Sequence, residues 1–337
     1  MLIPTTYASA LLLLLLSFVC LGSWANTFKL TGTRWRFELF YVDFAIGAIV
    51  LAVVAAYTLG SSGELAFSDR MLVAGRMAQA WVVLGGVIFN FGNMLLVAAI
   101  SLVGMSMAFP LSAGTALVIW SCFHLQTKNA PLLSIGIVLM IFAVVLDAFA
   151  CRKVRGNPKN RHPRDHGRLR PSTKGIIAGI LGGVALGFCY PVAADSMDPE
   201  FGVGPYAGIL LFGIGIFLST IVFSAYFMRI TIEGSSLRFN DYLRGRARKH
   251  LLGFASGVIC LAGILSAVII DSVPPNSAVN PTTAFILPLA SVLLAILWGV
   301  ARWKELKSLS ASAKWLLACT AMSFGGGLAA IGFALAQ

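Results

Sequence analysis

The chain has 337 residues, of which 58% are hydrophobic and 11% charged, and its formal net charge is +12. Soluble domains carry about 25% charged residues, so this composition excludes a soluble enzyme with a single anchor. Stretches of about 20 apolar residues indicate membrane-spanning helices. The chain contains many such stretches, and no hydrophilic segment is long enough for a separate catalytic domain.

The first apolar run, YASALLLLLLSFVCLGSWA, has the length of a signal peptide. A signal peptide needs a positive segment before its apolar run, whereas the first basic residue here, Lys29, follows the run. We therefore predict a retained first helix and an all-α polytopic membrane protein. The expected spans are 5–26, 43–60, 77–99, 105–124, 130–151, 174–194, 205–228, 251–270, 282–301 and 313–335.

Between these spans the basic residues fall in alternate loops. The loops after the first, fifth, seventh and ninth spans hold 22 of the 25 Lys and Arg residues. Loops rich in Lys and Arg face the cytoplasm, so both termini are expected outside the inner membrane. The positive charge is thereby explained by membrane topology, and no nucleic-acid partner is expected.

Two segments of eleven residues resemble one another, PLSAGTALVIW at 110–120 and PLASVLLAILW at 288–298. They belong to the fourth and ninth spans. Two weaker matches have the same order: GGVIFNFG in the third span resembles SGVICLAG in the eighth, and CLGSWAN in the first resembles ALGFCYP in the sixth. We predict two inverted five-helix repeats, 1–151 and 174–337, joined by a basic cytoplasmic linker at 152–173. Inverted repeats are typical of secondary transporters, although similar composition could also produce such matches.

Glycines recur every fourth residue in the sixth span, at Gly175, Gly179, Gly183 and Gly187. This spacing predicts one face on which a neighbouring helix approaches closely. The run from Gly325 to Gly327 indicates a flexible or closely packed point. None of the six cysteines shows metal-ligand or disulfide spacing, no GxxxxGK[ST] motif supports an ATP-driven pump, and the four histidines lie in loops or at span ends. We expect neither an enzyme nor a resident cofactor or metal.

Two stretches, 22–47 (GSWANTFKLTGTRWRFELFYVDFAIG) and 85–120, resemble the glucose/ribose porter and ureide permease branch of the drug/metabolite transporter superfamily. The plan of ten spans around a basic central loop also resembles it. The resemblance implies a secondary carrier for a small polar solute, commonly proton-linked: a sugar, or a nucleobase-like heterocycle in the ureide branch. Plant ureide permeases carry a nucleotide-loop-like sequence centrally, and its absence here places the chain nearer the sugar-type members.

Polar residues inside spans usually face the interior of the helix bundle. Asn90 and Asn93 share one face of the third span, and their amides offer the donors and acceptors that a polar solute needs; the alternative is a hydrogen bond between helices. In the fourth span, Ser112 and Thr115 are also three residues apart. Pro110 frees a backbone carbonyl one turn earlier, and that carbonyl could line a cavity.

Trp24 and its counterpart Tyr190 are candidates for aromatic contact with a substrate ring, with interfacial anchoring as the alternative for Trp24. Asp43 and Asp147 are candidates for ion coupling. The alternatives are a helix-dipole role for Asp43 near Arg34 and Arg36, and an ion pair between Asp147 and the nearby Arg152 or Lys153.

We therefore predict a secondary transporter that moves a small polar solute across the inner membrane by alternating access. A sugar is the first choice, a nucleobase or ureide the second, and export of an amphipathic metabolite the third. Protons are a possible coupling ion beside facilitated diffusion, and the sequence assigns no oligomeric state.

Overall fold

The structure is a computed structural model, and it describes residues 4, 6–32, 35–62, 66–153, 171–193, 196, 202–273 and 279–335. Much of the predicted linker at 152–173 lies outside these ranges. Ten helical spans are long and apolar enough to cross a membrane among the residues described. The prediction of an all-α polytopic membrane protein is confirmed.

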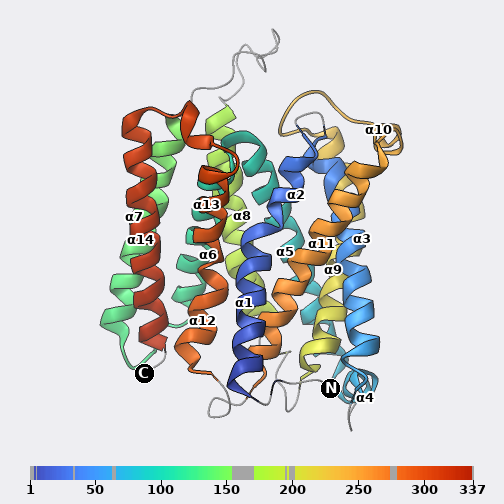
Figure 1. The fold of residues 1–337 in the computed structure, drawn as a ribbon. Helices are drawn as coiled ribbons and strands as arrows, with labels where there is room; N and C mark the ends of the chain where they lie inside the picture. The colour runs from blue at the N-terminus through green and yellow to red at the C-terminus, as the bar shows by residue number, and fades with distance from the viewer. Residues whose placement is uncertain are drawn as a thin grey trace.

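The long helices are bundled side by side (Figure 1). Eight spans are single helices: α3 (Phe37–Thr58), α5 (Arg76–Val103), α6 (Met105–Cys122), α7 (Ala130–Arg152), α8 (Pro171–Ala193), α9 (Gly204–Arg229), α11 (Ala247–Asp271) and α14 (Ala311–Leu335). Two spans are interrupted, the first as α1 (Tyr7–Ser23) and α2 (Ala25–Leu30), and the ninth as α12 (Pro281–Leu289) and α13 (Ser291–Ala301). The short elements α4 (Phe67–Val73), α10 (Phe239–Leu243) and η3 (Glu305–Ser308) lie between spans.

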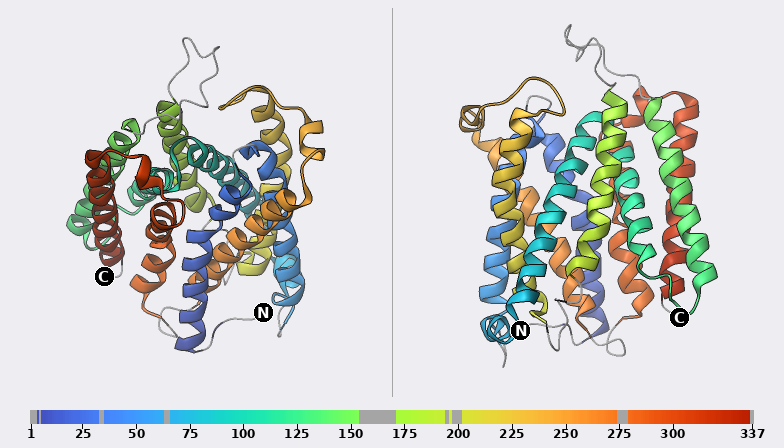
Figure 2. Two further views of the ribbon diagram at one scale, coloured as in Figure 1. Left: turned by 45° about the horizontal axis from the view of Figure 1, so that its top comes forward. Right: turned by 180° about the vertical axis from the view of Figure 1, so that it is seen from behind.

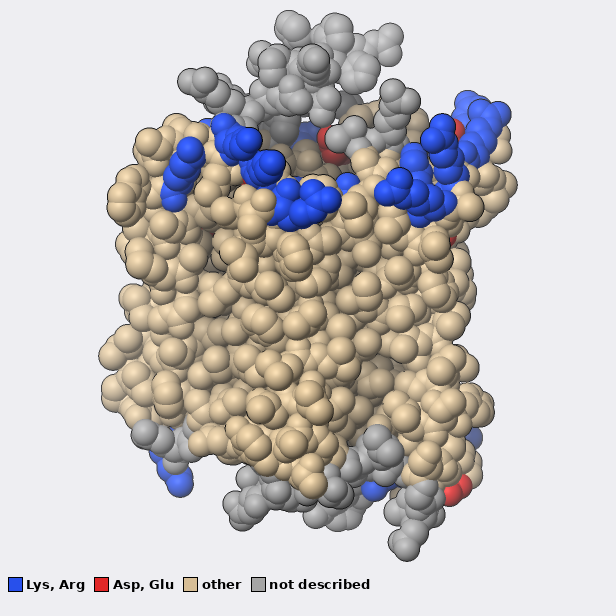
Figure 3. All heavy atoms as spheres, in the orientation of Figure 1, with Lys and Arg blue, Asp and Glu red and all other residues tan. Residues whose placement is uncertain are grey.

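Charge is concentrated at one end of the bundle. Lys and Arg side chains gather along the rim where α2 and α10 lie, above a band of uncharged side chains (Figure 3). Both termini lie at the other end (Figure 1). We call the first the basic end and the second the opposite end.

The third and eighth spans each pack between two helices of the other half of the chain. α5 packs against α8 and α9, whereas α11 packs against α1 and α3; the view from behind shows α8 between α5 and α6 (Figure 2). A Cβ atom at Gly86 of α5 would lie 2.2 Å from the backbone oxygen of Phe212, and one at Gly257 of α11 would lie 1.9 Å from that of Phe44. Only glycine permits either approach.

The predicted glycine stripe of the sixth span does face neighbouring helices. Cβ atoms at Gly179, Gly183 and Gly187 of α8 would each lie within 2.4 to 2.7 Å of atoms of α6, and one at Gly175 within 2.6 Å of Val103. Gly325 lies instead inside the uninterrupted helix α14, where the nearest atom to an added Cβ would be 3.9 Å away. Two residues later, a Cβ atom at Gly327 would lie 3.1 Å from the Gly136 backbone oxygen, so the closely packed alternative fits Gly327 of this run.

Candidate functional site

The first span is divided at Trp24, whose backbone angles stay helical, and side chains bond to backbone carbonyls there. The Asn26 amide donates to the carbonyl of Ser23 at 3.0 Å, and the hydroxyls of Thr27 and Ser256 donate to that of Trp24 at 2.7 and 3.1 Å. Such bonds compete with the helical ladder. Interrupted helices commonly form the solute sites of transporters, so the Trp24 turn is a candidate site.

Four aromatic side chains gather at this turn, which we call the aromatic cluster: Trp24, Tyr41, Phe44 and Phe109. Trp24 lies 5.6 Å from Phe44 and 6.1 Å from Phe109 between ring centroids, and Tyr41 lies 4.6 Å from Phe44. Trp24 is only 3% exposed. The alternative of an interfacial anchor is therefore wrong for Trp24.

Asn93 of α5 completes this cluster with a polar group. Its amide nitrogen donates to the Tyr41 hydroxyl at 2.8 Å, and both side chains are buried. Among the described residues, no donor reaches the Asn93 side-chain oxygen, and no acceptor takes the Tyr41 hydroxyl proton. The pair thus retains one acceptor, the Asn93 oxygen, and two donors, the second amide proton of Asn93 and the Tyr41 hydroxyl proton.

Asn90, three residues earlier, connects two helices instead. Its amide nitrogen donates to the hydroxyls of Ser219 at 2.7 Å and Thr220 at 3.0 Å, and its oxygen accepts from Thr220 at 3.2 Å. These bonds use both the donor and the acceptor functions of the amide. They match the alternative role of an interhelical hydrogen bond between α5 and α9.

The predicted residues of the fourth span face α8. Both Ser112 and Thr115 lie against Gly183, and the Thr115 hydroxyl donates to the Leu111 carbonyl of its own helix at 2.7 Å. The buried Ser112 hydroxyl has no hydrogen-bond partner in the described structure. No hydrogen bond between described residues joins either of them to Asn93. Tyr190 lies in α8, but its side chain is outside the described structure.

Asp43 belongs to a different polar group, inside the second span. Its carboxylate accepts from the Tyr242 hydroxyl at 2.6 Å and lies 3.0 Å from Nδ1 of His250. Span two begins at Phe37 and Arg36 pairs with Glu38, so the expectation that Asp43 begins the helix beside Arg36 is wrong; Arg34 lies outside the described residues. Tyr242 lies outside the spans, and burial of its hydroxyl raises its pKa. The hydrogen bond to the Asp43 carboxylate and the negative charge of that carboxylate raise this pKa further.

Asp147 of α7 is fully buried, and neither carboxylate oxygen has a hydrogen-bond partner in the described structure. The Arg152 guanidinium lies over the Phe149 ring instead, 5.8 Å from its centroid. No ion pair joins Asp147 to Arg152 or Lys153 among the described residues, so the expected pairing is wrong.

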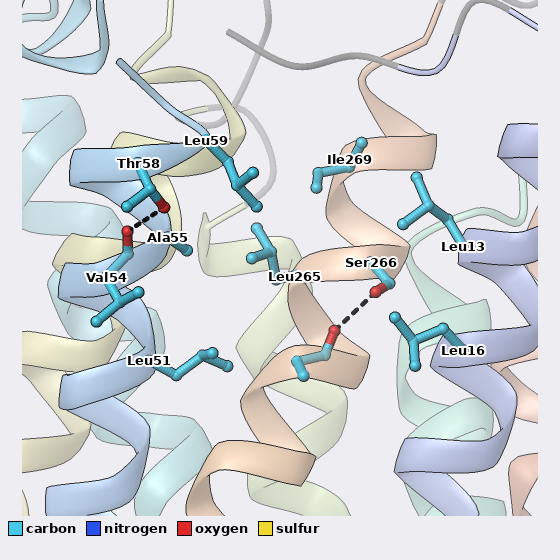
Figure 4. A pocket seen from close by; sticks show the side chains of 11 residues that line it. Leu13, Leu16, Leu51, Val54, Ala55, Thr58, Leu59, Leu265, Ser266 and Ile269 are labelled. Carbon is cyan, nitrogen blue, oxygen red and sulfur yellow. Dashed lines mark hydrogen bonds between the residues drawn. The ribbon is translucent and has the colours of Figure 1, made fainter. Parts of the chain in front are cut away.

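A pocket of about 230 Å³ lies between α1, α3 and α11 (Figure 4). Apolar side chains dominate its lining, and its two hydroxyls donate to their own helices, Thr58 to Val54 at 2.6 Å and Ser266 to Ala262 at 2.8 Å. Leu16 on its rim is 46% exposed. This lining suits a lipid chain and offers a polar solute no unused donor.

Sequence reasoning missed Tyr41 and His250. Tyr41 lies within a run of apolar residues, and only its pairing with Asn93 distinguishes it from a packing residue. His250 looked like a loop residue, yet it lies in the first turn of α11. Among the described residues, no three His, Cys, Asp or Glu side chains gather as a metal site, and all six cysteines are free.

Comparisons with known proteins give two related transporters and one fold. No protein-family model matches the chain. The chain is 29% identical to ureide permease 4 of Arabidopsis thaliana over 151 residues, 42% of this chain and 38% of the relative, and 24% identical to ureide permease 2 of the same plant over 147 residues, 41% and 37%. The matches thus span about two fifths of each relative's length. A crystal structure of 16% identity covers 96% of both chains with a TM-score of 0.53, which shows the fold alone.

Proposed function

We propose that the chain is a membrane transporter that moves a small planar solute with amide-like edges, a ureide or a nucleobase, by alternating access. Its similarity to two ureide permeases supports transport. The same similarity favours a nucleobase or ureide, our second expected substrate, over a sugar, our first. The wider kinship with sugar porters of the drug/metabolite transporter superfamily stays part of the proposal. We therefore propose a carrier and not an enzyme.

The observation that carries the substrate class is the Asn93–Tyr41 pair. A ureide or lactam edge presents an N–H beside a C=O. The unused oxygen of Asn93 can accept from that N–H, and the unused proton of the Tyr41 hydroxyl can be donated to that C=O. Trp24 and Phe109 supply aromatic faces on which a flat ring can stack. A sugar has several hydroxyls to satisfy, and this group of side chains offers fewer polar partners.

We propose that the two halves, 1–151 and 174–337, are inverted repeats joined by the linker at 152–173, and that the basic end faces the cytoplasm with both termini outside. The exchange of neighbours between α5 and α11 supports the repeat, and the position of the basic side chains supports the orientation (Figure 3). Alternating access then takes place as one half rocks against the other.

Asp43 and Asp147 are our candidates for proton coupling. Asp43 lies beside the His250 imidazole and the Tyr242 hydroxyl, two side chains that can carry a proton. Asp147 is buried without a hydrogen-bond partner in the described structure, and an unpaired charge buried there would be costly. Uptake measured against an imposed pH gradient, in the parent and in Asp43→Asn and Asp147→Asn, tests this part of the proposal.

Binding of allantoin, uracil and glucose to the purified protein tests the substrate class. Removing one polar partner from a bound ligand costs about 1–3 kcal/mol, so Asn93→Ala and Tyr41→Phe should each weaken ureide or nucleobase binding by roughly ten-fold or more. Asn90→Ala is the matched control, because it breaks the bonds to Ser219 and Thr220 and should lower the melting temperature with affinity unchanged. Binding of glucose alone, or unaltered affinity in Asn93→Ala, would contradict the proposal.

A further inference from the structure

Glu305, in the loop between the ninth and tenth spans, reaches across to the first half of the chain. Its carboxylate accepts the backbone N–H groups of Met105 and Ser106, each at 2.9 Å, and the Ser106 hydroxyl at 2.6 Å. It also forms an ion pair with Lys29 of α2. We call Lys29, Ser106 and Glu305 the latch.

The backbone around the latch leaves room only for this carboxylate. A Cβ atom at Gly104 would lie 2.8 Å from it, and one at Gly299 would lie 2.6 Å from its Oε2 atom. Gly104 has a φ of 94°, which favours glycine. Lys304, just before Glu305, has a φ of 54° and is the one non-glycine residue with positive φ in the described part of the chain. Residues other than glycine adopt this conformation rarely, often at functional sites.

Two indole groups strengthen the same junction. The Trp303 indole N–H donates to Asn26 at 2.6 Å, and the Trp298 indole N–H donates to Ser23 at 3.0 Å. Lys29 also lies over the Trp303 ring, 5.4 Å from its centroid. The first span is therefore bonded to the ninth span and the loop after it by several polar contacts, from Ser23 beside Trp24 to Lys29 at the basic end.

The latch lies directly between the aromatic cluster and the basic end. Phe109 of the cluster follows Ser106 by three residues in α6, and Trp24 precedes Lys29 by five residues in the first span. At 1.5 Å per residue, Phe109 is about 5 Å and Trp24 about 8 Å deeper in the bundle than the latch residue of the same span. A solute that leaves the cluster toward the basic end along these two spans would meet the latch.

We propose that the latch is the gate at the basic end, that Glu305 is its positioning residue, and that the gate opens when Glu305 releases Lys29 and the N-terminus of α6. This inference rests on the proposed transport function. A substitution can shift the balance between two conformations only through contacts that differ between them. Contacts that join the two halves at one end meet this condition, because rocking of one half against the other breaks them at that end and spares the opposite end.

The native Cys260 is a suitable reporter for this gate. It is 3% exposed and lies one helical turn after Ser256 of α11, whose hydroxyl donates to the Trp24 carbonyl of the cluster. The experiment uses the full chain in membrane vesicles of both orientations, with the other five cysteines replaced by alanine. A charged, membrane-impermeant thiol reagent is applied from one side at a time, and the labelling rate of Cys260 is measured.

Glu305→Gln and Lys29→Met should each raise labelling from the basic end by roughly ten-fold, the change expected for the loss of one charge-assisted hydrogen bond from the closed state. Labelling from the opposite end should fall. Lys29→Met leaves the carboxylate on the helix N-terminus, so it also serves if Glu305→Gln fails to fold. The control is Lys307→Gln, an exposed basic residue of the same short helix with no ion pair among the described residues, and it should change neither rate.

Equal increases from both ends, or a lowered melting temperature without any sided change, would overturn the gate and leave Glu305 a structural residue. The labelling requires no solute, so the result is independent of the substrate. A sided shift in a protein that binds neither ureide nor nucleobase would uphold the gate and contradict the proposed substrate class. Absence of the shift in a protein that transports a ureide would contradict the gate alone.

Discussion

Asp43 and Asp147 are both buried carboxylates within spans, but their surroundings differ. Asp43 has Tyr242 and His250 as partners, whereas Asp147 has no hydrogen-bond partner in the described structure. We therefore expect Asp43→Asn to lower the free energy of unfolding by about 1.5–3 kcal/mol, the usual contribution of a hydrogen bond to a charged group. Asp147→Asn should leave it almost unchanged. Thermal unfolding of both variants in detergent checks this, and equal losses would contradict it.

The pH dependence of Glu305 follows from its pKa. Burial raises this pKa, but the Lys29 charge and the Ser106 donors outweigh burial and hold it below its ordinary value of 4.5. A carboxyl whose pKa is depressed by folding stabilises the protein above its unfolded-state pKa, and this stability is lost as the pH falls through the folded-state value.

We accordingly expect the melting-temperature difference between the parent and Glu305→Gln to be constant from roughly pH 5 to 8 and to shrink only below about pH 4.5. A series of melting curves on both proteins measures it. A difference that disappears between pH 6 and 7 would show that a group other than Glu305 controls the latch.

Asn90 and Asn93 show how far sequence can assign single residues. Both are amides in the same apolar helix, three residues apart, and spacing alone predicts the same role for them. Their partners decide the matter, because Asn90 meets two hydroxyls of α9 and Asn93 meets one hydroxyl of α3. Neither partner is visible in the local sequence, since Ser219 and Tyr41 are 129 and 52 residues away.

At the scale of helices, close glycine contacts make a sharp prediction. Gly257→Ala would place a Cβ 1.9 Å from the Phe44 backbone oxygen, so α11 and α3 must separate. Overpacking of this kind typically costs about 1–3 kcal/mol. Gly325→Ala is the matched control in α14, where space is available and the exchange should stabilise the helix by up to about 1 kcal/mol. Melting temperatures that move in the same direction for both variants would contradict this packing.

The spans themselves were predictable, and their interruptions were not. Apolar length alone located all ten spans, since a span needs about 20 apolar residues to cross the bilayer. The first span was expected to end at 26 but continues to Leu30, and the second starts at Phe37 rather than at Asp43. One of the side chains that bond to carbonyls at Trp24 is Ser256 of α11, a tertiary contact that no local pattern reveals.

At the scale of the whole molecule, matching contacts support the inverted repeat. Cβ atoms at Gly47 and Gly215 would lie 2.0 and 2.2 Å from the backbone oxygens of Phe254 and Val83. When α3 is aligned with α9 and α5 with α11, the Gly86–Phe212 contact corresponds to Gly257–Phe44. The same alignment makes the Gly215–Val83 contact correspond to Gly47–Phe254. The sequence match of GGVIFNFG with SGVICLAG gives the same register for α5 and α11.

The fourth and ninth spans match less closely. A Cβ atom at Gly187 would lie 2.8 Å from the Ala116 backbone oxygen, and one at Gly22 would lie 2.8 Å from that of Ser291. If Gly22 is aligned with Gly187, these contacts align Ala116 with Ser291. That register is three residues away from the predicted one, which aligns Pro110 with Pro288. Pro110 lies inside an unbroken helix, whereas Pro288 precedes the break between α12 and α13, so the two segments share sequence but differ in local structure.

The orientation of the whole molecule gives the last prediction. With 22 of the 25 basic residues in alternate loops, translocation of the basic end across the membrane would be strongly disfavoured. We expect that end to face the cytoplasm. Two single cysteines on exposed residues test this in a chain whose exposed Cys122 is replaced by serine: Lys307→Cys at the basic end and Ser68→Cys in α4 at the opposite end.

A membrane-impermeant maleimide applied to intact cells should label Ser68→Cys and should reach Lys307→Cys only after the membrane is permeabilised. The chain with neither cysteine added controls for labelling of the remaining native thiols. Labelling of Lys307→Cys in intact cells would reverse the topology. The latch would then close the outer side of the membrane, while the aromatic cluster, the Asn93–Tyr41 pair and the helix contacts would be unaffected, because none of them depends on which side the basic end faces.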